Sequence, residues 1–260
     1  MNLKDTVCIV TGSSTGIGAA CAVALAEKGC HIVINYTRSE AEADATAKEC
    51  ERRGAQSLVV RADVANDADC RRLAEAALKK WGHIDYLVNN AGTTKFVPNH
   101  ADLDALHAED FHRIYSVNVI GAFQMIRAVV PAMRKQGRGG VVNVSSVAGV
   151  MGTGSSVAYA ASKGALNTMT LSLARALAPE IRVNAVCPGF VETRWLQQGF
   201  GEKYEQMKAS FENRAPLHQV IVPEDIAGAV AWFLEADHVT GEFVIVDSGL
   251  HLGAVPLKGR

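Results

Sequence analysis

Short apolar runs alternate with amphipathic segments along residues 1–90. Four runs, each bounded by polar residues, predict buried strands at Val7–Val10, Ile32–Ile34, Leu58–Val60 and Tyr86–Val88. The segments between them, 17–28, 40–53 and 68–81, have helical character. Strands that alternate with helices of about 10–15 residues are typical of βαβ units and a parallel sheet.

The residues at the ends of these segments support the same division. Each predicted helix ends in basic residues and is then followed by a glycine, at Gly29, Gly54 and Gly82. Cations offset the negative end of a helix, and glycine adopts the left-handed conformation at low cost. Ser39 with Glu42 has the spacing of a capping box at the start of the second helix.

The second half of the chain continues the pattern. The elements that it predicts are a long helix over 109–134, a strand at Val141–Val144, a helix over 157–178, a strand at Arg182–Cys187 stopped by Pro188-Gly189, a helix opening at Pro223 and a last strand at Phe243–Val246. Residues 190–222 lack a clean period and predict a flap with helical pieces. No linker divides the chain, so we expect a single α/β domain over 1–260, with about seven parallel strands and helices on both faces.

Composition excludes several classes of protein. A chain of 260 residues with 48% hydrophobic and 20% charged residues is neither disordered nor fibrous. The net charge of −1 gives no field that favours nucleic acid or an anionic membrane. We find no apolar run that approaches a membrane span and no secretory signal before the first strand. The six cysteines form no C-x-x-C pair, so we expect free thiols in the cytoplasm and neither a disulfide framework nor a metal site.

The first strand leads into a glycine-rich turn, Thr11 to Gly18, that opens a helix. Glycines let the backbone approach a phosphate closely, and the free N–H groups of the helix start bind the anion. Gly12 to Gly16 also matches G-x-S-x-G, the nucleophile elbow of α/β-hydrolases. The hydrolase alternative requires a late histidine, and none follows a late strand convincingly.

Tyr159 and Lys163 are four residues apart in a predicted helix and therefore share one face. An ammonium near a tyrosine favours the phenolate and lowers the tyrosine pKa, which suits an acid/base at neutral pH. A surface tyrosine stacked on a lysine stem gives the same spacing, so the pair alone does not establish a site.

In combination, the motifs resemble the short-chain dehydrogenase/reductase family over residues 5–252. The matching elements are the turn Thr11–Gly18, Asn89-Asn90-Ala91-Gly92 after the fourth strand, Asn118 in a helix, Ser145-Ser146 after a strand, Tyr159 with Lys163, and Pro188-Gly189. The resemblance implies a Rossmann-type fold and hydride transfer between a nicotinamide and a carbonyl or alcohol carbon. It also suggests a homotetramer.

The resemblance implies a catalytic set of Asn118, Ser146, Tyr159 and Lys163. Tyr159 would exchange a proton with the substrate oxygen, Ser146 would hydrogen-bond that oxygen, and Lys163 would lower the tyrosine pKa and hold the nicotinamide ribose. Asn118 would support a water-linked proton path to Lys163. The family's spacing favours Ser146, although Ser145 remains an alternative.

The implied cofactor contacts follow the same motifs. They are Gly12, Ser14, Thr15, Gly16, Ile17, Gly18, Tyr36, Thr37, Arg38, Asp63, Val64, Asn90, Ala91, Gly92, Tyr159, Lys163, Pro188, Gly189, Val191 and Thr193. An acid at the end of the second strand would select NAD, but Tyr36 stands there, and Arg38 nearby could pair with a 2′-phosphate. The sequence therefore favours NADP(H), with NAD(H) as the alternative.

The substrate is less defined than the chemistry. We expect a small carbonyl or alcohol compound, bound among the loop after Gly92, the loop 149–156 and the flap, with Val150, Met151, Phe190, Trp195, Leu196 and Phe200 as apolar candidates. The layout is most similar to 3-oxoacyl-carrier-protein reductases, although Ser248, the segment before Pro223 and a long loop over 93–110 depart from that branch. The alternatives are an NAD-linked dehydrogenase of a sugar, polyol or secondary alcohol and, more remotely, a non-catalytic redox sensor.

Overall fold

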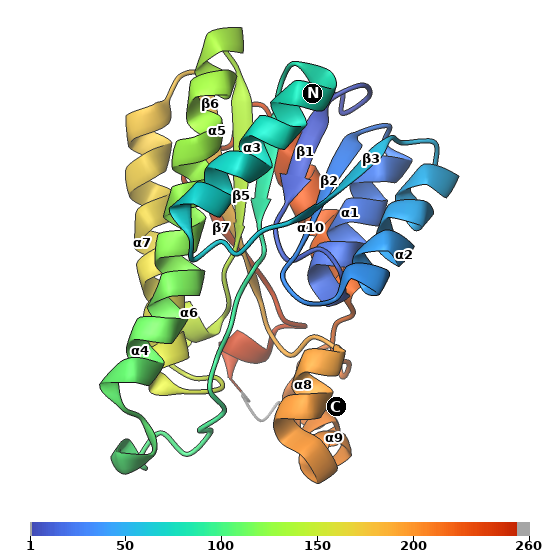
Figure 1. Ribbon diagram of the computed structural model, residues 1–260. Helices are drawn as coiled ribbons and strands as arrows, with labels where there is room; N and C mark the ends of the chain where they lie inside the picture. The colour runs from blue at the N-terminus through green and yellow to red at the C-terminus, as the bar shows by residue number, and fades with distance from the viewer. Residues whose placement is uncertain (1, 254–260) are drawn as a thin grey trace.

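Seven parallel strands form one sheet in the order β3-β2-β1-β4-β5-β6-β7 (Figure 1). The strands are β1 Val7–Val10, β2 His31–Tyr36, β3 Ser57–Arg61, β4 Tyr86–Asn89, β5 Gly139–Val144, β6 Ile181–Pro188 and β7 Phe243–Val246. This computed structural model describes residues 2–253, so residues 1 and 254–260 of the expected domain lie outside the described part. The predicted doubly wound α/β sheet is confirmed.

The strand order reverses between β1 and β4, which pair as neighbours although two strands separate them along the chain. In open parallel sheets the loops on the two sides of such a point diverge and leave a crevice at the carboxyl ends of the strands. The glycine-rich turn after β1 and the loop after β4 both begin here, so the topology alone places two of the sequence motifs side by side.

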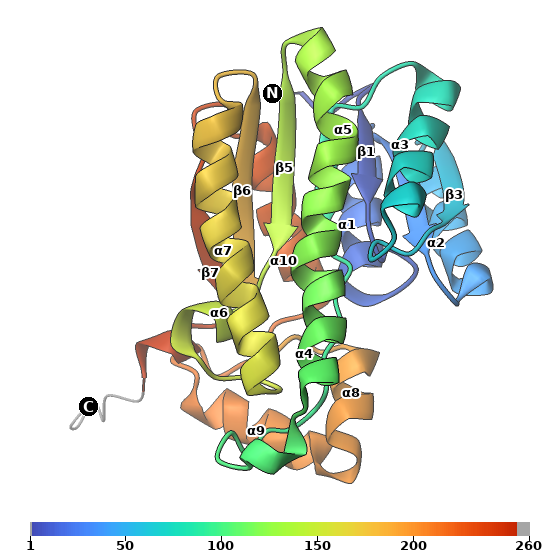
Figure 2. The same cartoon turned by 60° about the vertical axis from the view of Figure 1, so that its left-hand side comes forward.

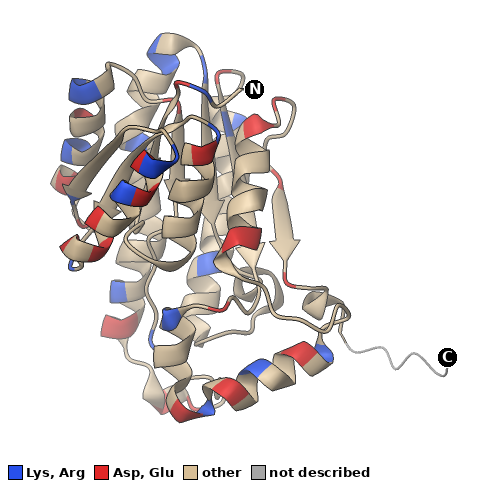
Figure 3. Ribbon diagram, turned by 90° about the vertical axis from the view of Figure 1, so that its right-hand side faces the viewer, with Lys and Arg blue, Asp and Glu red and all other residues tan. Residues whose placement is uncertain are grey.

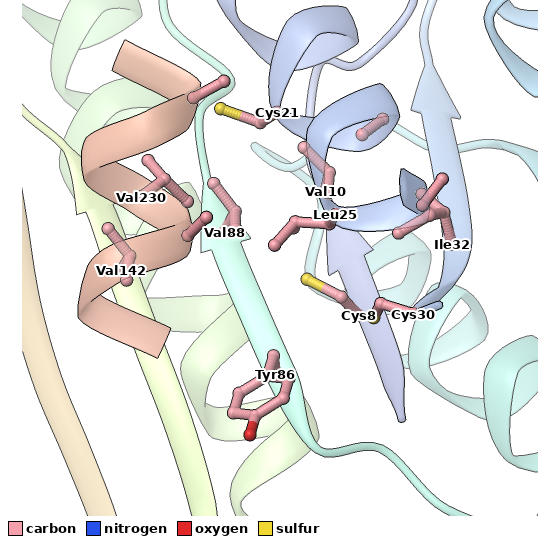
Figure 4. Packing of buried hydrophobic residues seen from close by; sticks show 14 of the residues in the cluster. Cys8, Val10, Cys21, Leu25, Cys30, Ile32, Tyr86, Val88, Val142 and Val230 are labelled. Carbon is pink, nitrogen blue, oxygen red and sulfur yellow. The ribbon is translucent and has the colours of Figure 1, made fainter. Parts of the chain in front are cut away.

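Helices cover both faces of the sheet (Figure 2). Buried residues of α1 (Gly16–Glu27), α2 (Glu40–Arg52) and α10 (Pro223–Glu235) join one hydrophobic cluster, which Figure 4 shows around Leu25, Val88 and Val230. Those of α3 (Asp67–Trp81), α5 (Ala122–Gln136) and α7 (Val157–Leu177) join the second cluster on the opposite face. Because both faces are covered, the central strands are buried along their whole length and mostly apolar, rather than alternating between apolar and polar residues.

The predicted glycines stand after the first three helices, and Gly29, Gly54 and Gly82 all have positive φ angles. The capping box predicted for Ser39 and Glu42 is wrong. Ser39 has ψ of 75° instead of an extended backbone, and its side chain makes no capping hydrogen bond. Glu42 instead forms an ion pair with Arg194, at the start of α8 (Arg194–Phe200).

The long helix expected over 109–134 is observed as α4 (Ala108–Tyr115), a π-helical turn η2 (Ser116–Gly121) and α5. Single π turns inside α-helices often mark functional sites, and this one contains Asn118. The helical stretch Ala108–Gln136 is long and apolar enough to span a membrane by those measures alone, contrary to our reading of the sequence. In the fold it is a core helix, because Met125, Val129 and Met133 pack in the second cluster.

The flap expected over 190–222 consists of α8, a 3-10 turn at Gly201–Lys203 and α9 (Tyr204–Arg214). It lies beyond the carboxyl ends of the strands, as does the short helix α6 (Ala148–Met151), and in Figure 1 the flap and α4 stand on opposite sides of this end of the molecule. The loop after β4 contains one 3-10 turn, Leu103–Ala105, and a last one, Leu250–Leu252, follows β7. The flap lies at the edge of the sheet where the candidate site is found.

Candidate active site

The glycine-rich turn is held in place by the loop after β4. The Asn90 side chain donates to the carbonyl oxygens of Thr11 (2.9 Å) and Gly12 (3.0 Å). In return, the Thr11 hydroxyl accepts from the backbone N–H groups of Asn90 and Ala91, both at 3.0 Å. This reciprocal set connects two predicted cofactor motifs and fixes their spacing.

A side chain on the third glycine of the turn would not fit. A Cβ on Gly18 would lie 2.4 Å from the Gly12 oxygen and 2.5 Å from the Asn90 amide nitrogen. Gly12 and Gly16 have φ angles of +61° and +58°, which favour glycine. The turn therefore presents bare backbone at the start of α1, where Thr15 provides no side-chain cap and the first turn holds no acid. These features fit the pyrophosphate of a dinucleotide.

A hollow lies at the carboxyl ends of β2 and β3. It is lined by Tyr36, Thr37, Arg38, Glu40 and Arg61. Tyr36 and Arg61 are register partners in the paired strands, so the topology brings Arg61 beside the segment that carries Arg38. Neither guanidinium forms an ion pair with any residue of 2–253, whereas a hydrogen bond between Tyr36 and Glu40 raises the pKa of Tyr36.

Arg61 is a residue that the sequence analysis missed. The signal was available, because a parallel sheet with β3 beside β2 places the last residue of β3 next to that of β2. Asp63 and Val64 follow it as expected. The Val64 side chain is buried and its carbonyl accepts from Gln124 at 2.7 Å, so Val64 also anchors this edge to α5.

Asn118 ties the π-helical turn to the loop after β4 and to α7. Its side-chain amide donates to the Thr93 oxygen and the Ser162 hydroxyl, both at 3.0 Å, and its oxygen accepts from the Thr93 N–H at 2.8 Å. Gly92 lies close by, because a Cβ there would be 3.5 Å from the Asn118 oxygen and 3.8 Å from the Lys163 nitrogen. The π-helical turn with Asn118 and the loop after β4 with Gly92 therefore both lie next to Lys163 on α7.

Tyr159 and Lys163 are buried neighbours on α7. The Lys163 nitrogen lies 5.6 Å from the centre of the Tyr159 ring and donates to the Val144 oxygen at 2.8 Å. Burial lowers the pKa of Lys163 to about 8. Burial also raises the pKa of Tyr159 to about 12, against a smaller lowering effect of a hydrogen bond with Ser146.

We expected Lys163 to lower the pKa of Tyr159, but in this structure burial outweighs any such effect and the pKa of Tyr159 is raised. Desolvation of a buried phenolate outweighs other effects, and the lysine is itself directed at a backbone carbonyl. At neutral pH the pair consists of a neutral phenol and a charged ammonium.

The two adjacent serines have different surroundings. Ser145 is buried and donates to the Lys163 carbonyl oxygen at 3.2 Å. Ser146 is half-buried, accepts from the Ala148 N–H at 3.1 Å and donates to the Pro188 oxygen at 3.4 Å, and it is the serine that acts to lower the pKa of Tyr159. The geometry therefore supports Ser146 over Ser145 as the group that faces a substrate.

The segment after β6 completes the cofactor side. Gly189 packs against Asp247 so closely that a Cβ would lie 2.4 Å from the Cβ of Asp247. Thr193 caps α8 and lies opposite the glycine-rich turn, since its methyl group would be 3.7 Å from a Cβ on Gly16. Val191 is buried and bridges to Ile221, so only its backbone is available to a ligand.

The apolar candidates on the substrate side separate into two groups. Phe190 is buried in the flap, with ring centres 4.7 Å from Phe211 and 5.9 Å from Tyr204, and belongs to the core of the flap. Trp195 instead lies 5.9 Å from the Tyr159 ring and remains 41% exposed. Phe96, in the loop after β4, contacts Trp195 and was not predicted.

Comparisons with known proteins agree with this geometry. A family model described as enoyl-(acyl carrier protein) reductase matches residues 12–251. The chain belongs to the short-chain dehydrogenase/reductase family, whose members include NAD(P)-dependent oxidoreductases.

Individual relatives cover nearly the whole chain. A protein of Streptomyces violaceoruber assigned as ketoacyl reductase 2 of the granaticin polyketide synthase is 42% identical over 95% of this chain and 96% of its own. A 3-oxoacyl-[acyl-carrier-protein] reductase of Synechocystis is 36% identical, with 95% and 98% covered. The structure of a 7α-hydroxysteroid dehydrogenase with NADH and 7-oxo glycochenodeoxycholic acid is 29% identical, with 95% of both chains covered and a TM-score of 0.87. The chain is therefore an oxidoreductase similar to ketoacyl reductases.

Proposed function

We propose that this protein is an NADP(H)-dependent carbonyl reductase whose catalytic residues are Asn118, Ser146, Tyr159 and Lys163. The observation that carries the proposal is the convergence of a phenol, a hydroxyl and an ammonium beside the glycine-rich turn. The Ser146 hydrogen bond to Tyr159 and the short approach of Gly92 to Lys163 support it. The substrate is a small molecule that contains a ketone or, in reverse, a secondary alcohol.

Tyr159, Ser146 and Lys163 have different roles in protonating the substrate oxygen. When bound, NADP(H) supplies the hydride for the carbonyl carbon and is left oxidised. Tyr159, a neutral phenol at pH 7, donates its proton to the carbonyl oxygen, and Ser146 hydrogen-bonds that oxygen as its negative charge develops. The Lys163 ammonium then stabilises the phenolate that Tyr159 becomes.

Asn118 acts by position. All of its side-chain hydrogen bonds in the structure connect the loop after β4, through Thr93, to α7, through Ser162. These contacts support a role in holding Lys163 at the correct distance, and the water-linked proton path remains a prediction.

The proposed acid favours C=O over C=C reduction, although the family model is described with an enoyl substrate. Reduction of a ketone places charge on an oxygen, which two hydroxyl donors match. Reduction of an enoyl C=C needs a proton on carbon. The names of the ketoacyl and oxoacyl reductase relatives support the carbonyl.

The charges around the hollow at the carboxyl ends of β2 and β3 support the preference for NADP(H). Arg38 and Arg61 both line it, and guanidinium groups pair well with phosphate. Its carboxylate, Glu40, is engaged with Tyr36, which occupies the position where an acid would hold the ribose of NAD. The steroid dehydrogenase relative was solved with NADH, so NAD(H) remains the alternative.

The first experiment is a fluorescence titration of the protein with NADPH and with NADH. We expect tighter binding of NADPH, and we expect Arg38→Ala and Arg61→Ala each to weaken NADPH binding by about tenfold while leaving NADH binding within about twofold. Arg134→Ala, an exposed arginine on α5, provides the control. Equal losses for both nucleotides would exclude reading of the 2′-phosphate, and a wild-type preference for NADH would favour the NAD-linked alternative.

Tyr159→Phe tests the chemistry separately. Ketone reduction should fall by at least about a hundredfold, because the proton donor is lost, while NADPH binding stays unchanged. Full activity of the variant would exclude Tyr159 as the acid.

We also propose that the protein acts in the cytoplasm as a homotetramer. Its six cysteines are all buried and free, and Ile120, Phe123 and Leu171 leave apolar surface exposed on long helices. A monomer mass by light scattering would contradict the assembly.

A further inference from the structure

We propose that the substrate is a ketone within a fused-ring body rather than a linear oxoacyl chain. This inference rests on the proposed carbonyl reductase function, because it concerns what lies beside the Tyr159 hydroxyl. It is carried by a wall of three aromatic residues, Phe96, Trp195 and Phe200, which we call the aromatic wall.

The aromatic wall begins at the proposed acid. Trp195 lies 5.9 Å from the Tyr159 ring, centre to centre, with an angle of 51° between the planes. Phe96 lies 5.6 Å from Trp195, and Phe200 lies 5.7 Å from Phe96, both in edge-to-face arrangements. The aromatic wall thus continues beyond Trp195 through two further ring contacts. Together the three rings offer more aromatic surface than a single ring does.

The position of Phe96 is built into the fold. A Cβ on Gly199 would lie 2.0–2.4 Å from atoms of the Phe96 ring, so only glycine at that position of α8 admits it. Val97, the next residue, donates its N–H to the Ser155 oxygen at 2.7 Å, and the Thr94 and Ser155 hydroxyls are 2.7 Å apart. The loop that carries Phe96 is therefore fixed to the segment before α7.

The Trp195 end of the aromatic wall differs from the core of the flap. Phe190, in the segment after β6, and Tyr204 of α9 are both 7% exposed and pack together in that core. Phe200 stacks on Phe190 with ring centres 6.1 Å apart, so it joins the wall to the core. Trp195 retains 41% exposure although it contacts two rings, and on α6 the side chains of Val150 and Met151 are exposed as well. Aromatic residues are only 6% of the chain, so their gathering at the site is not a matter of composition.

The aromatic wall favours a rigid ring system over a flexible chain as substrate. Fused aromatic and alicyclic ring systems are rigid and bury their area against ring faces with little loss of internal rotation, whereas a linear acyl chain has many rotatable bonds to fix. The flap also carries acidic and basic residues in alternation, so it offers no surface of one sign to a charged carrier (Figure 3). A free ring ketone fits both features.

The test compares two substrates under NADPH. Trans-1-decalone represents a fused-ring ketone, and acetoacetyl-N-acetylcysteamine represents a linear oxoacyl thioester. We expect kcat/KM to be at least about tenfold higher for the decalone. Trp195→Ala should lower kcat/KM for the decalone by about tenfold and for the thioester by less than about threefold, whereas Trp195→Phe should keep the preference.

The control is Trp232→Ala, which removes an exposed tryptophan on α10, and NADPH titration of every variant shows that the cofactor site is intact. An equal or higher kcat/KM for the thioester, or equal losses for both substrates in Trp195→Ala, would overturn the ring-ketone inference and leave the reductase function standing. Failure of the wild type to reduce either compound while it binds NADPH would overturn the proposed function and this inference with it.

Discussion

Lys163 illustrates how strongly burial acts on the site. Its side chain is 4% exposed, and burial lowers its pKa from an ordinary 10.5 to about 8. Each pKa unit corresponds to about 1.4 kcal/mol, so holding the ammonium in the folded protein at pH 7 costs about 3 kcal/mol. Replacing Lys163 with methionine, which has a similar shape and no charge, removes that cost.

The variant also loses one favourable contact. Lys163 donates to the Val144 oxygen at 2.8 Å, and an unsatisfied buried carbonyl costs about 1–3 kcal/mol. The two effects have opposite signs, so at pH 7 Lys163→Met should be equal to the wild type in stability or more stable by up to about 2 kcal/mol.

The pH dependence separates the two effects. Between pH 8 and 10.5 the unfolded chain keeps a proton on Lys163 that the folded protein has released, so the free energy of unfolding of the wild type rises with pH in this window. Relative to Lys163→Met, the rise should approach about 1.4 kcal/mol per pH unit. The hydrogen bond does not titrate and shifts the two curves by a constant.

The assay is urea unfolding at pH 7, 8, 9 and 10, with nucleotide-free protein at one concentration, because ligands and assembly add terms of their own. Lys135→Met, an exposed lysine on α5, is the control and should give a curve parallel to that of the wild type. A stability difference between wild type and Lys163→Met that stays constant from pH 7 to 10 would refute the reasoning.

Three further predictions concern the turn, the reaction and the thiols. Gly18→Ala should weaken NADPH binding by at least about tenfold and destabilise the protein by about 2 kcal/mol, because its Cβ would meet the Gly12 oxygen. The control is Gly228→Ala, in open space on α10, which should be neutral or stabilising in the same titration and urea assays. Equal behaviour of the two variants would contradict the close approach at Gly18. The kcat for ketone reduction should fall as pH rises through about 8, because Lys163 then loses the charge that stabilises the Tyr159 phenolate, and a flat profile from pH 6 to 10 would exclude this role. The folded protein should show no thiol that reacts rapidly with a disulfide reagent at pH 8, since all six cysteines are buried, and all six should react after unfolding in guanidinium; a rapid thiol in the folded state would contradict the packing.

The sequence predicted the sheet well because both of its faces are covered. Strands such as β1, buried along their whole length, appear as continuous apolar runs, and the glycines after α1, α2 and α3 mark where each helix ends. The π-helical turn could not be predicted, since the apolar period passes through Ser116–Gly121 without interruption. The turn is joined by hydrogen bonds between Asn118 and Thr93, a residue in the loop after β4 that the helical period does not include.

In the candidate site, the sequence could predict only the residues that belong to recognisable motifs. Spacing on a helix identified Tyr159 and Lys163, but the direction of the tyrosine pKa depends on how deeply the ring is buried, which spacing does not give. Arg61 required knowledge of the strand order, and Phe96 required knowledge that Gly199 of α8 leaves room for its ring. Residues recruited by tertiary packing from outside any motif were the ones missed.

The same burial that raises the tyrosine pKa also sets the protonation state of the unliganded site. With Tyr159 neutral and Lys163 charged at pH 7, the pair holds one proton ready for an oxygen and one positive charge ready for the phenolate that remains. Oxidation of an alcohol would begin from the phenolate, which the buried site disfavours by about 3 kcal/mol relative to an exposed tyrosine. Proton donation therefore needs no prior change in either residue, whereas proton removal needs the positive charges of Lys163 and a bound oxidised nicotinamide to offset the desolvation. At pH 7 the unliganded site thus holds the protonation state from which reduction of a ketone would begin.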